Sequence, residues 1–327
     1  MRTLGWASVL LVACAGGNAQ PATRASAPGP SEPRADASIA VTDASADATE
    51  VAREPQTGCG CTDYADPTPV GTLPLVLDET SGLAASRKNR GVLYAHNDSG
   101  DTARIFALDE KGALLGEIAF GGATAVDWED LAVGPCPAGS CVWVGDVGDN
   151  HKSRSDYALY RIAEPSLDGT PFAKRTVAAE KFPFAYPDGQ WNCETVLVHP
   201  KTGEVFLVTK VGMSAAGVYR FPTKLVAGTP VTLEKVGAAA GTAMSLVTGG
   251  DISPCGDRVL LRTYFSLFEY AIPPGKSIAE ALATAPTKVP VAKEPQGEAV
   301  AFRADGRGYF TAPEGNAVTL SANGCLH

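Results

Sequence analysis

The sequence lacks several features that mark large classes of protein. It contains no Lys/Arg-rich run and has a formal net charge of -9, which argues against a nucleic-acid partner. No apolar run reaches the roughly 20 residues that a membrane-spanning helix needs. The G-x-S-x-G, H-E-x-x-H and P-loop signatures are also absent, so a serine-hydrolase elbow, a zinc-protease helix and a phosphate-binding loop are not expected.

The chain nevertheless has enough apolar material to fold. Its 327 residues are 45% hydrophobic and 19% charged, which excludes a collagenous or wholly disordered protein. Residues 15–56 differ from the rest, because they are rich in Ala, Pro, Ser, Thr and Asp and have almost no large apolar side chain. We therefore predict a tether over residues 15–56, with a reach of roughly 35 to 40 Å, and a folded, monomeric domain over residues 57–327.

The N-terminal segment MRTLGWASVLLVACAGG combines one Arg, a short apolar run from Leu4 to Val12 and small residues around Cys14. It resembles a bacterial lipoprotein signal over residues 1–14, in which cleavage before Cys14 leaves a lipidated cysteine. An ordinary secretory signal is the alternative. Both interpretations place the chain outside the cytosol, and the first anchors it to a membrane of the bacterial cell envelope, at the outer membrane or a periplasmic face.

Seven cysteines remain after Cys14, and an oxidising compartment makes disulfides plausible. Cys136 and Cys141 flank the tight loop CPAGSC, which predicts that they pair with each other. Cys325 could pair with Cys59 or Cys61 and tie the ends of the domain together. The odd count leaves at least one thiol unpaired. Beyond the first pair, the connectivity stays open among Cys59, Cys61, Cys193, Cys255 and Cys325.

One short pattern occurs five times in the domain. Each copy has a polar first residue, a small or acidic third residue and, in all five, an apolar fifth residue. The copies are ETSGLAA (Glu79–Ala85), DWEDLAV (Asp127–Val133), NCETVLV (Asn192–Val198), TGGDISP (Thr248–Pro254) and QGEAVAF (Gln296–Phe302). This recurrence indicates a structural repeat.

Each copy continues in the same way. A second apolar strand follows, such as VLYAHND or VFLVTK, and then a third, such as RIFALD or YALYRI. A weaker fourth run comes before the next copy, as at residues 174–179 and 230–235. Four antiparallel strands repeated radially predict an all-β fold, a β-propeller of five four-stranded blades, with six blades as the alternative. The last copy lacks a fourth strand, and GTLPLVLD (residues 71–78) could supply it and close the ring.

The first strand of each blade is expected to line the central channel with its polar face. At one level this face brings together Ser81, Glu129, Glu194, Gly250 and Glu298. Close carboxylates repel by roughly 4 kcal/mol per pair at 4 Å and an effective dielectric of 20, so they bind either protons or a cation. Oxygen donors without His or Cys favour Ca²⁺. The alternative is a solvated acidic channel without a specific metal.

The order Ser, Glu, Glu, small residue, Glu, in the segments SGLAA, EDLAV, ETVLV, GDISP and EAVAF, resembles the calcium-activated nucleotidases, or soluble apyrases. The resemblance would cover Leu75 to Ser321. It implies a five-bladed propeller with a central calcium held by such a ring, although the family has Ser in the fourth unit, where this chain has Gly250. Secreted phytase-like and esterase-like propellers share similar fragments, E-x-S-G-L-A and N-D-S-G.

The first and second strands of a blade are antiparallel, so the start of one and the end of the other lie on the same edge. This edge is expected to collect, at the channel mouth, Glu79, Asp127, Asn192, Thr248 and Gln296. Loops after the second strands add acids that could orient water, Asp98 and Asp149, and cations that could bind an anionic group, Arg154, Lys210 and Arg262. Many of these are also ordinary turn residues.

Two functions are compatible with this arrangement. One is a membrane-tethered, calcium-dependent hydrolase of phosphoric esters or phosphoanhydrides that acts on a small anionic substrate such as a nucleotide. The other is a non-catalytic propeller that binds a glycan, a peptide or a protein partner through the same face. The fold alone does not choose between them.

Overall fold

The computed structural model describes residues 59–61 and 63–326. The predicted signal over residues 1–14 with its lipidation residue Cys14, and the predicted tether over residues 15–56, lie outside the described residues. Within the described ranges, no helix combines the length and hydropathy that a membrane span needs.

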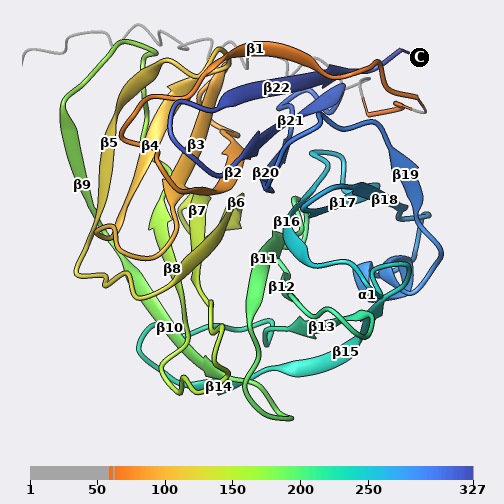
Figure 1. Ribbon diagram of the computed structural model, residues 1–327. Helices are drawn as coiled ribbons and strands as arrows, with labels where there is room; N and C mark the ends of the chain where they lie inside the picture. The colour runs from red at the N-terminus through yellow and green to blue at the C-terminus, as the bar shows by residue number, and fades with distance from the viewer. Residues whose placement is uncertain (1–58, 62, 327) are drawn as a thin grey trace, which may run out of the picture. The chain divides into compact units, whose positions relative to one another are not determined.

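Five sheets surround a central channel, which confirms the prediction of a five-bladed, all-β propeller (Figure 1). In each sheet the strand nearest the channel is the first strand of one sequence repeat. The bounds of blades 1 and 2 are as follows. Blade 1 contains β2 (Thr80–Ala85), β3 (Val92–Asn97), β4 (Arg104–Asp109), β5 (Leu114–Gly121) and β9 (Lys174–Ala178). Blade 2 contains β6 (Trp128–Cys136), β7 (Gly139–Asp146), β8 (Ala158–Ala163), β10 (Glu180–Ala185) and β14 (Val231–Thr232).

The other three blades have four strands each. Blade 3 contains β11 (Cys193–Val198), β12 (Val205–Thr209), β13 (Ala216–Arg220) and β15 (Glu234–Ala239). Blade 4 contains β16 (Val247–Ile252), β17 (Arg258–Thr263), β18 (Leu267–Ala271) and β19 (Thr287–Val289), with the short helix α1 (Ile278–Leu282) before β19. Blade 5 contains β20 (Gly297–Phe302), β21 (Gly308–Pro313), β22 (Thr319–Gly324) and β1 (Thr68–Thr72).

The core consists of apolar layers between neighbouring blades. Trp128 of β6 is 1% exposed and packs with Tyr94 of β3 and Tyr160 of β8 in one such layer. Another layer joins blades 5 and 1, through residues such as Phe310 and Phe106. These layers account for the apolar positions of the repeat, because each inner strand is buried on both sides.

Two buried carboxylates also join neighbouring inner strands. Asp130 of β6 accepts a hydrogen bond from the backbone N–H of Val196 in β11, at 2.8 Å. Asp251 of β16 accepts one from the backbone N–H of Phe302 in β20, also at 2.8 Å. Burial raises the pKa of Asp251 to about 6, and the charge of Arg87 opposes this shift.

The prediction of the fourth strands was wrong at two places. The run at residues 174–179 forms β9, which pairs in parallel with β5 of the preceding blade, and β10 is the fourth strand of blade 2. The run at residues 230–235 contains β14, which pairs in parallel with β10 of the preceding blade, and only its last two residues belong to β15, the fourth strand of blade 3. Both segments cover a sheet edge whose backbone groups would otherwise lack partners, a role that strand propensity does not reveal.

The ring closes between the two ends of the domain, as predicted, but with a different segment. β1 pairs antiparallel with β22, with Thr68 opposite Ala322 and Thr72 opposite Thr319. The predicted closing segment, residues 71–78, therefore contributes only its first two residues. Pro74 follows almost at once and has no N–H to donate to a ladder, so the strand ends before it.

Three disulfides staple the domain. Cys136–Cys141 closes the β6–β7 hairpin, as predicted. Cys61 is the partner of Cys325, which ties the two ends of the domain together. Cys59 pairs with Cys255 in the loop after β16. Among the described cysteines, the unpaired thiol is that of Cys193, which is buried in β11.

Candidate functional site

Each inner strand contains a β-bulge near its start, and the bulge places one side chain at the channel. The pairing with the second strand shifts by one residue at the same point in all five blades. In a bulge two residues face one on the partner strand, and the bulged strand turns the extra residue to a new direction. The residues at this point are Ser81, Glu129, Glu194, Thr248 and Glu298.

The pairing corrects the predicted ring in blade 4. Gly250 pairs with Leu261, as Leu131 in blade 2 pairs with Val144, so it lies at an apolar position of the repeat. A Cβ added to Gly250 would meet Thr195 and the second strand of its own blade. The ring member is Thr248, which was predicted for the mouth. The alignment was displaced by two residues because Gly250 stands at the apolar position in blade 4, and the repeat pattern was matched to Ile252 instead.

The two hydroxyl residues of the ring connect neighbouring blades. Ser81 donates its hydroxyl hydrogen bond to the backbone carbonyl of Glu129 in the next inner strand. Thr248 donates in the same way to the carbonyl of Gly297, at 2.8 Å. Both hydroxyls are therefore engaged in holding the ring, and the three Glu side chains remain to line the cavity.

These glutamates border a cavity of about 230 Å³, which we call the acidic mouth. Its walls come from all five blades. Its charged lining residues are Glu79, Asp98, Glu129, Glu194, Lys210, Glu298 and Glu314, and its other lining residues include Ser81, Asn150, Tyr264 and Gln296. Lys210 is thus the one cation that faces six carboxylates among the residues described here.

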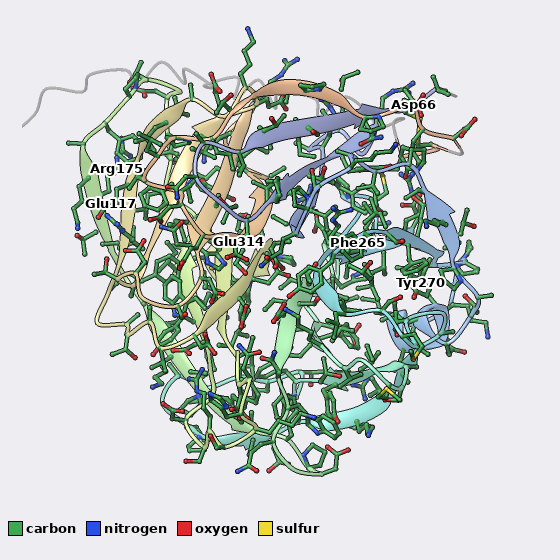
Figure 2. All side chains as sticks on the ribbon, viewed as in Figure 1. Asp66, Glu117, Arg175, Phe265, Tyr270 and Glu314 are labelled. Carbon is green, nitrogen blue, oxygen red and sulfur yellow. A yellow bond between two sulfur atoms is a disulfide. The ribbon has the colours of Figure 1, made fainter. Side chains whose placement is uncertain are left out.

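Two lining residues, Tyr264 and Glu314, were not among the predicted site residues. Each is the first residue after the second strand of its blade, as Asp98 is after β3 and Lys210 is after β12. In four blades the backbone N–H of the residue after the second strand donates to the backbone carbonyl of the first residue of the repeat, as from Asp98 to Glu79 at 2.8 Å and from Glu314 to Gln296 at 3.0 Å. Figure 2 shows Glu314 toward the middle of the ring. The place directly after each second strand was therefore the sequence signal that could have identified Tyr264 and Glu314.

Two carboxylates of the acidic mouth, those of Asp98 and Glu129, lie close to a third, that of the adjacent Asp127. One oxygen atom from each of Asp98, Asp127 and Glu129 lies within 4.8 Å of the others. The approach is possible because Gly148 has no side chain, since a Cβ there would overlap the carboxylates of Glu129 and Asp127. The predicted mouth residue Asp127 and the predicted catalytic residue Asp98 therefore meet the predicted metal ligand Glu129.

Burial and mutual repulsion hold protons on these groups. Burial first, and then the charge of Asp98, raise the pKa of Asp127 to about 6. Burial and the charges of Glu194 and Asp98 raise the pKa of Glu129 well above its ordinary value. Burial and Glu194 raise the pKa of Glu298 to about 9. The acidic mouth therefore cannot be fully ionised at neutral pH unless a cation compensates it.

Lys210 compensates part of this charge. Its Nζ lies 2.6 Å from Glu194 Oε2 and 4.7 Å from the centre of the Tyr264 ring. Burial raises the pKa of Glu194 to about 7 in spite of the opposing charge of Lys210. The predicted role of Lys210 in binding an anion therefore competes with an ion pair inside the protein.

The other two predicted catalytic residues do not line the acidic mouth. Asp149 is 3% exposed and accepts hydrogen bonds from the backbone N–H groups of Ser153 and Arg154, each at 2.9 Å, and from the Tyr157 hydroxyl at 2.6 Å. Arg154 donates to Asp146 at 2.7 Å and to the carbonyl of Gly148 at 2.8 Å. These contacts hold the loop that supplies Gly148.

Asn192 and Arg262 are also inside the protein. Asn192 accepts from the Asp149 backbone at 2.7 Å and donates to Glu194 at 3.2 Å, so it links that loop to the ring. Arg262 is fully buried between blades 4 and 5, where its Nη2 lies 2.5 Å from Glu294. Neither side chain reaches the cavity, whereas the predicted mouth residues Glu79 and Gln296 both line it.

An apolar rim lies on the same face as the acidic mouth, on the loops of blades 3 and 4. It consists of Met213, Met244, Leu246 and Phe265, which are 85%, 75%, 36% and 74% exposed. Met244 has a positive φ of 65°, which is uncommon for a residue with a side chain. The Phe265 ring lies 6.3 Å from the ring of Tyr264, so the rim is continuous with the cavity lining.

The fold and the site define a five-bladed β-propeller with a carboxylate-lined channel mouth. No family model and no curated protein matches the sequence. Among solved structures, the chain is similar to a gluconolactonase from Xanthomonas campestris, with 9% identity, a TM-score of 0.46, and coverage of 81% of this chain and 96% of that one.

It is also similar to the PQQ-bound aldose sugar dehydrogenase of Streptomyces coelicolor, with 13% identity, a TM-score of 0.43, and coverage of 79% of this chain and 98% of that one. At this level of similarity neither structure supports an argument about chemistry. The resemblance to soluble apyrases rests on sequence motifs alone.

Proposed function

We propose that the acidic mouth binds a hard divalent cation and that this cation is Ca²⁺. The observation that carries the proposal is the group of Asp98, Asp127 and Glu129, whose carboxylate oxygens lie within 4.8 Å of one another beside further glutamates. Oxygen-only donors of high charge suit calcium, which accepts 6 to 8 such ligands including water. No His or Cys lines the cavity among the described residues, so zinc is disfavoured.

The carboxylates would contribute unequally to binding the cation. Asp98, Asp127 and Glu129 would hold it, because they are closest to one another. Glu194 is paired with Lys210 and would contribute less. A bound calcium would lower the repulsion in the acidic mouth and polarise an oxygen atom of a substrate.

The reaction that this site would support is hydrolysis of a small phosphoric ester or phosphoanhydride. Asp98 and Lys210 are the two candidate catalytic residues that line the cavity. Lys210 would face an anionic group, and Asp98 would hold the attacking water. Asp149 and Arg154 would act only by positioning the loop that carries Gly148, because their hydrogen bonds are made within it.

Calcium binding is tested by thermal unfolding of the full chain carrying Cys14→Ala, in calcium and in excess chelator. A ligand at 100 times its dissociation constant adds about 2.7 kcal/mol to the free energy of unfolding, which corresponds to a rise in Tm of roughly 5 to 10 °C. Glu129→Gln should abolish the rise, and Glu110→Gln, at a half-buried turn where the carboxylate pairs with Arg303 and does not line the cavity, should not. Absence of a calcium effect in the unmodified site would overturn the proposal.

Hydrolysis is tested separately, with protein shown to hold calcium. Phosphate release from nucleoside di- and triphosphates and from simple phosphoesters should depend on calcium and fall sharply in Asp98→Asn. Calcium binding without turnover over this panel would leave the cation site in place and exclude the hydrolase.

The second candidate function is a non-catalytic propeller that binds a glycan, a peptide or a protein. The apolar rim favours it, because large exposed apolar side chains beside a rigid cavity are typical of recognition surfaces. Binding of the full chain to glycan and peptide arrays, compared with Phe265→Ser, would test this function. Signals that survive the substitution would contradict a role of the rim.

We also propose that the chain is an extracytoplasmic lipoprotein attached through Cys14. Metabolic labelling with a fatty acid, followed by fractionation of the cell envelope, should show a labelled, membrane-bound protein. Cys14→Ala should remove both the label and the attachment, and a secreted, unlabelled native protein would favour the ordinary signal peptide.

A further inference from the structure

A second cavity lies at the opposite end of the channel from the acidic mouth. Its volume is about 780 Å³. Every blade contributes to its wall just after or near the end of its inner strand. These contributions are Ser86 after β2, Val133 and Gly134 of β6, Pro200 after β11, Pro254 after β16 and Ala304 after β20.

The charged residues that line this cavity are all cations. They are Arg87 and Lys88 from blade 1 and Lys201 from blade 3, and we call the cavity the basic mouth. Within the described part of the chain, none of the three forms an ion pair within 4.0 Å with a carboxylate. The acids nearest to them are behind the wall. Glu164 accepts hydrogen bonds from Ser86 and Ser140, and Asp251 is buried and senses the charge of Arg87.

The hydrogen-bonding capacity of these cations is only partly used. Arg87 donates from Nη2 to the backbone carbonyl of Ile252 at 3.4 Å, which extends its side chain from blade 1 to blade 4. Its Nε and Nη1 atoms are buried and have no acceptor. Lys88 donates to the backbone carbonyl of Glu164 at 3.3 Å. Buried donors normally have partners, so the Arg87 guanidinium indicates a missing acceptor.

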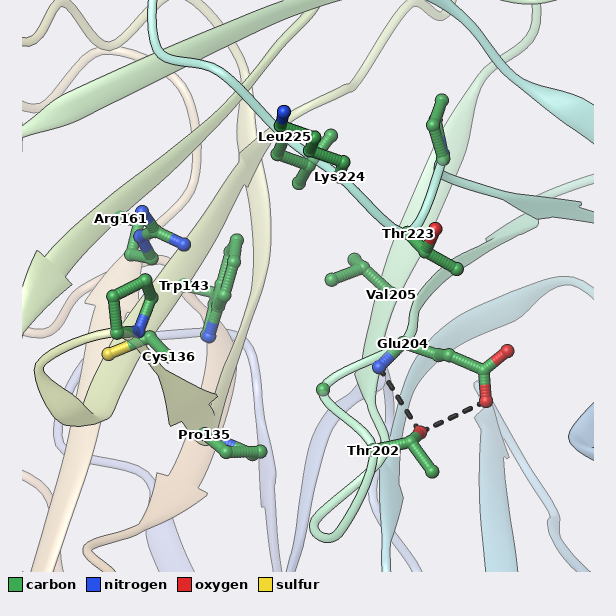
Figure 3. Close-up of a pocket in the computed structure, with 13 residues that line it drawn as sticks. Pro135, Cys136, Trp143, Arg161, Thr202, Glu204, Val205, Thr223, Lys224 and Leu225 are labelled. Atoms are coloured by element: carbon green, nitrogen blue, oxygen red, sulfur yellow. Dashed lines mark hydrogen bonds between the residues drawn. The ribbon is translucent and has the colours of Figure 1, made fainter.

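A cationic side chain in another cavity of the molecule, that of Arg161, is paired differently from those of the basic mouth. Between blades 2 and 3, Arg161 lines a cavity of about 400 Å³, with Trp143 on the same side and Val205 and Thr223 opposite (Figure 3). There the guanidinium lies 2.7 Å from Glu180 and 4.8 Å from the centre of the Trp143 ring. Its charge is already engaged, whereas the three cations of the basic mouth face a cavity without a carboxylate.

We infer that the basic mouth binds a phosphate group. A guanidinium and two ammonium groups around one cavity match the charge and the several acceptor oxygens of a phosphate. The cavity is large enough for a substituent on that phosphate, so the group could belong to free phosphate or to a lipid headgroup. This site is independent of the proposed function, because it shares no residue with the acidic mouth.

The path of the chain supports a lipid headgroup as the source of the bound phosphate. Cys59, the first described residue, is bonded to Cys255, and the neighbouring Pro254 lines the basic mouth. The described chain therefore begins on the face that carries the basic mouth. If Cys14 is lipidated, this face is the one whose chain leads to the membrane.

The experiment uses the full chain carrying Cys14→Ala, so that no lipid anchor can contribute. Inorganic phosphate is titrated by calorimetry, and flotation is measured with vesicles of phosphatidylglycerol and, for comparison, of phosphatidylcholine. Lys201→Met should weaken binding of whichever probe binds, inorganic phosphate or the phosphatidylglycerol vesicle, about tenfold, equivalent to 1.4 kcal/mol. Arg87→Lys should also weaken it, because an ammonium lacks the planar fork of donors. Lys288→Met is the matched control, since Lys288 is an exposed lysine of β19.

The outcomes separate the two sources. Binding of inorganic phosphate without flotation assigns the site to free phosphate, and flotation only with phosphatidylglycerol assigns it to a headgroup. Equal effects of Lys201→Met and Lys288→Met would show nonspecific attraction and overturn the inference. Binding of neither probe would also overturn it, whatever the acidic mouth does with calcium.

Discussion

Near the starts of the five inner strands lies a cavity of about 230 Å³ whose charged lining is six carboxylates and one lysine. Past the ends of the same strands lies a cavity of about 780 Å³ whose charged lining residues are all cations. The starts carry bulges, which turn ring side chains into the channel. The ends lead into hairpin loops, where residues such as Arg87 and Lys201 are free of the ladder. One scaffold thus supports two sites of opposite charge that can change independently.

The acidic mouth contains its own cation, the Lys210 ammonium group. Removing it should cause the largest change in the free energy of unfolding. In Lys210→Met, Glu194 would stay buried without its partner, so the free energy of unfolding in chelator should fall by about 3 kcal/mol. Calcium should restore part of the loss. Urea unfolding with and without calcium measures both changes.

The control for this prediction is Lys174→Met, because the ion pair of Lys174 with Glu117 is on the outer edge of blade 1 and the lysine side chain is 57% exposed. Exposed pairs contribute at most about 1 kcal/mol. Similar losses in the two variants would contradict a special role for the cation of the acidic mouth.

The next largest effect should be the pH dependence of stability that comes from Asp251, which is buried behind the wall of the basic mouth. Its folded pKa of about 6 lies above the ordinary value of 3.8, so the native state holds its proton more tightly than the unfolded state. Stability from this group is therefore present below about pH 4 and is lost as the pH rises through about 6. At 1.36 kcal/mol per pKa unit the loss is on the order of 3 kcal/mol.

Asp251→Asn cannot titrate, so the difference in unfolding free energy between the native chain and this variant should change by that amount between pH 4 and pH 7. Asp305→Asn, at an exposed turn, should show no such change. If the difference in unfolding free energy between the native chain and Asp251→Asn were independent of pH, the raised pKa of Asp251 would be refuted.

The smallest expected effect concerns the space around the carboxylates. Gly148→Ala would push a methyl group against Glu129 and Asp127 and should weaken calcium binding about tenfold, or 1.4 kcal/mol. Gly212→Ala is the control, because a Cβ there has only one ordinary contact, at 3.7 Å from Leu246. Calorimetric titration with calcium distinguishes them, and phosphate binding at the basic mouth should be the same in both.

Much of the fold was predictable because the repeat is carried by buried positions. The apolar fifth residue of each copy packs between blades, so the number of blades followed from counting copies. The three glutamates of the ring were predictable for the same reason, since each stands two residues before such a position. Glu314 and Tyr264 could have been found by extending the count to the residue after each second strand.

The remainder depended on contacts that a single sequence does not contain. Thr248 replaced Gly250 because blade 4 has a glycine at the apolar position of the repeat, so the sequence pattern was aligned two residues too late. Asp149 and Arg154 have the residue types of a catalytic pair, but hydrogen bonds within their own loop engage both. The outer strands β9 and β14 pair with a preceding blade, which depends on an edge left open elsewhere.

The arrangement of the disulfides has a mechanical consequence. β1 closes the ring through backbone hydrogen bonds to β22, and such a strand could be peeled away by a force applied at its N-terminal end. A pull on the chain before Cys59 would instead meet the bond to Cys255 and then the bond of Cys61 to Cys325. The load would pass into blades 4 and 5 through covalent bonds, and the closing strand would bear little of it.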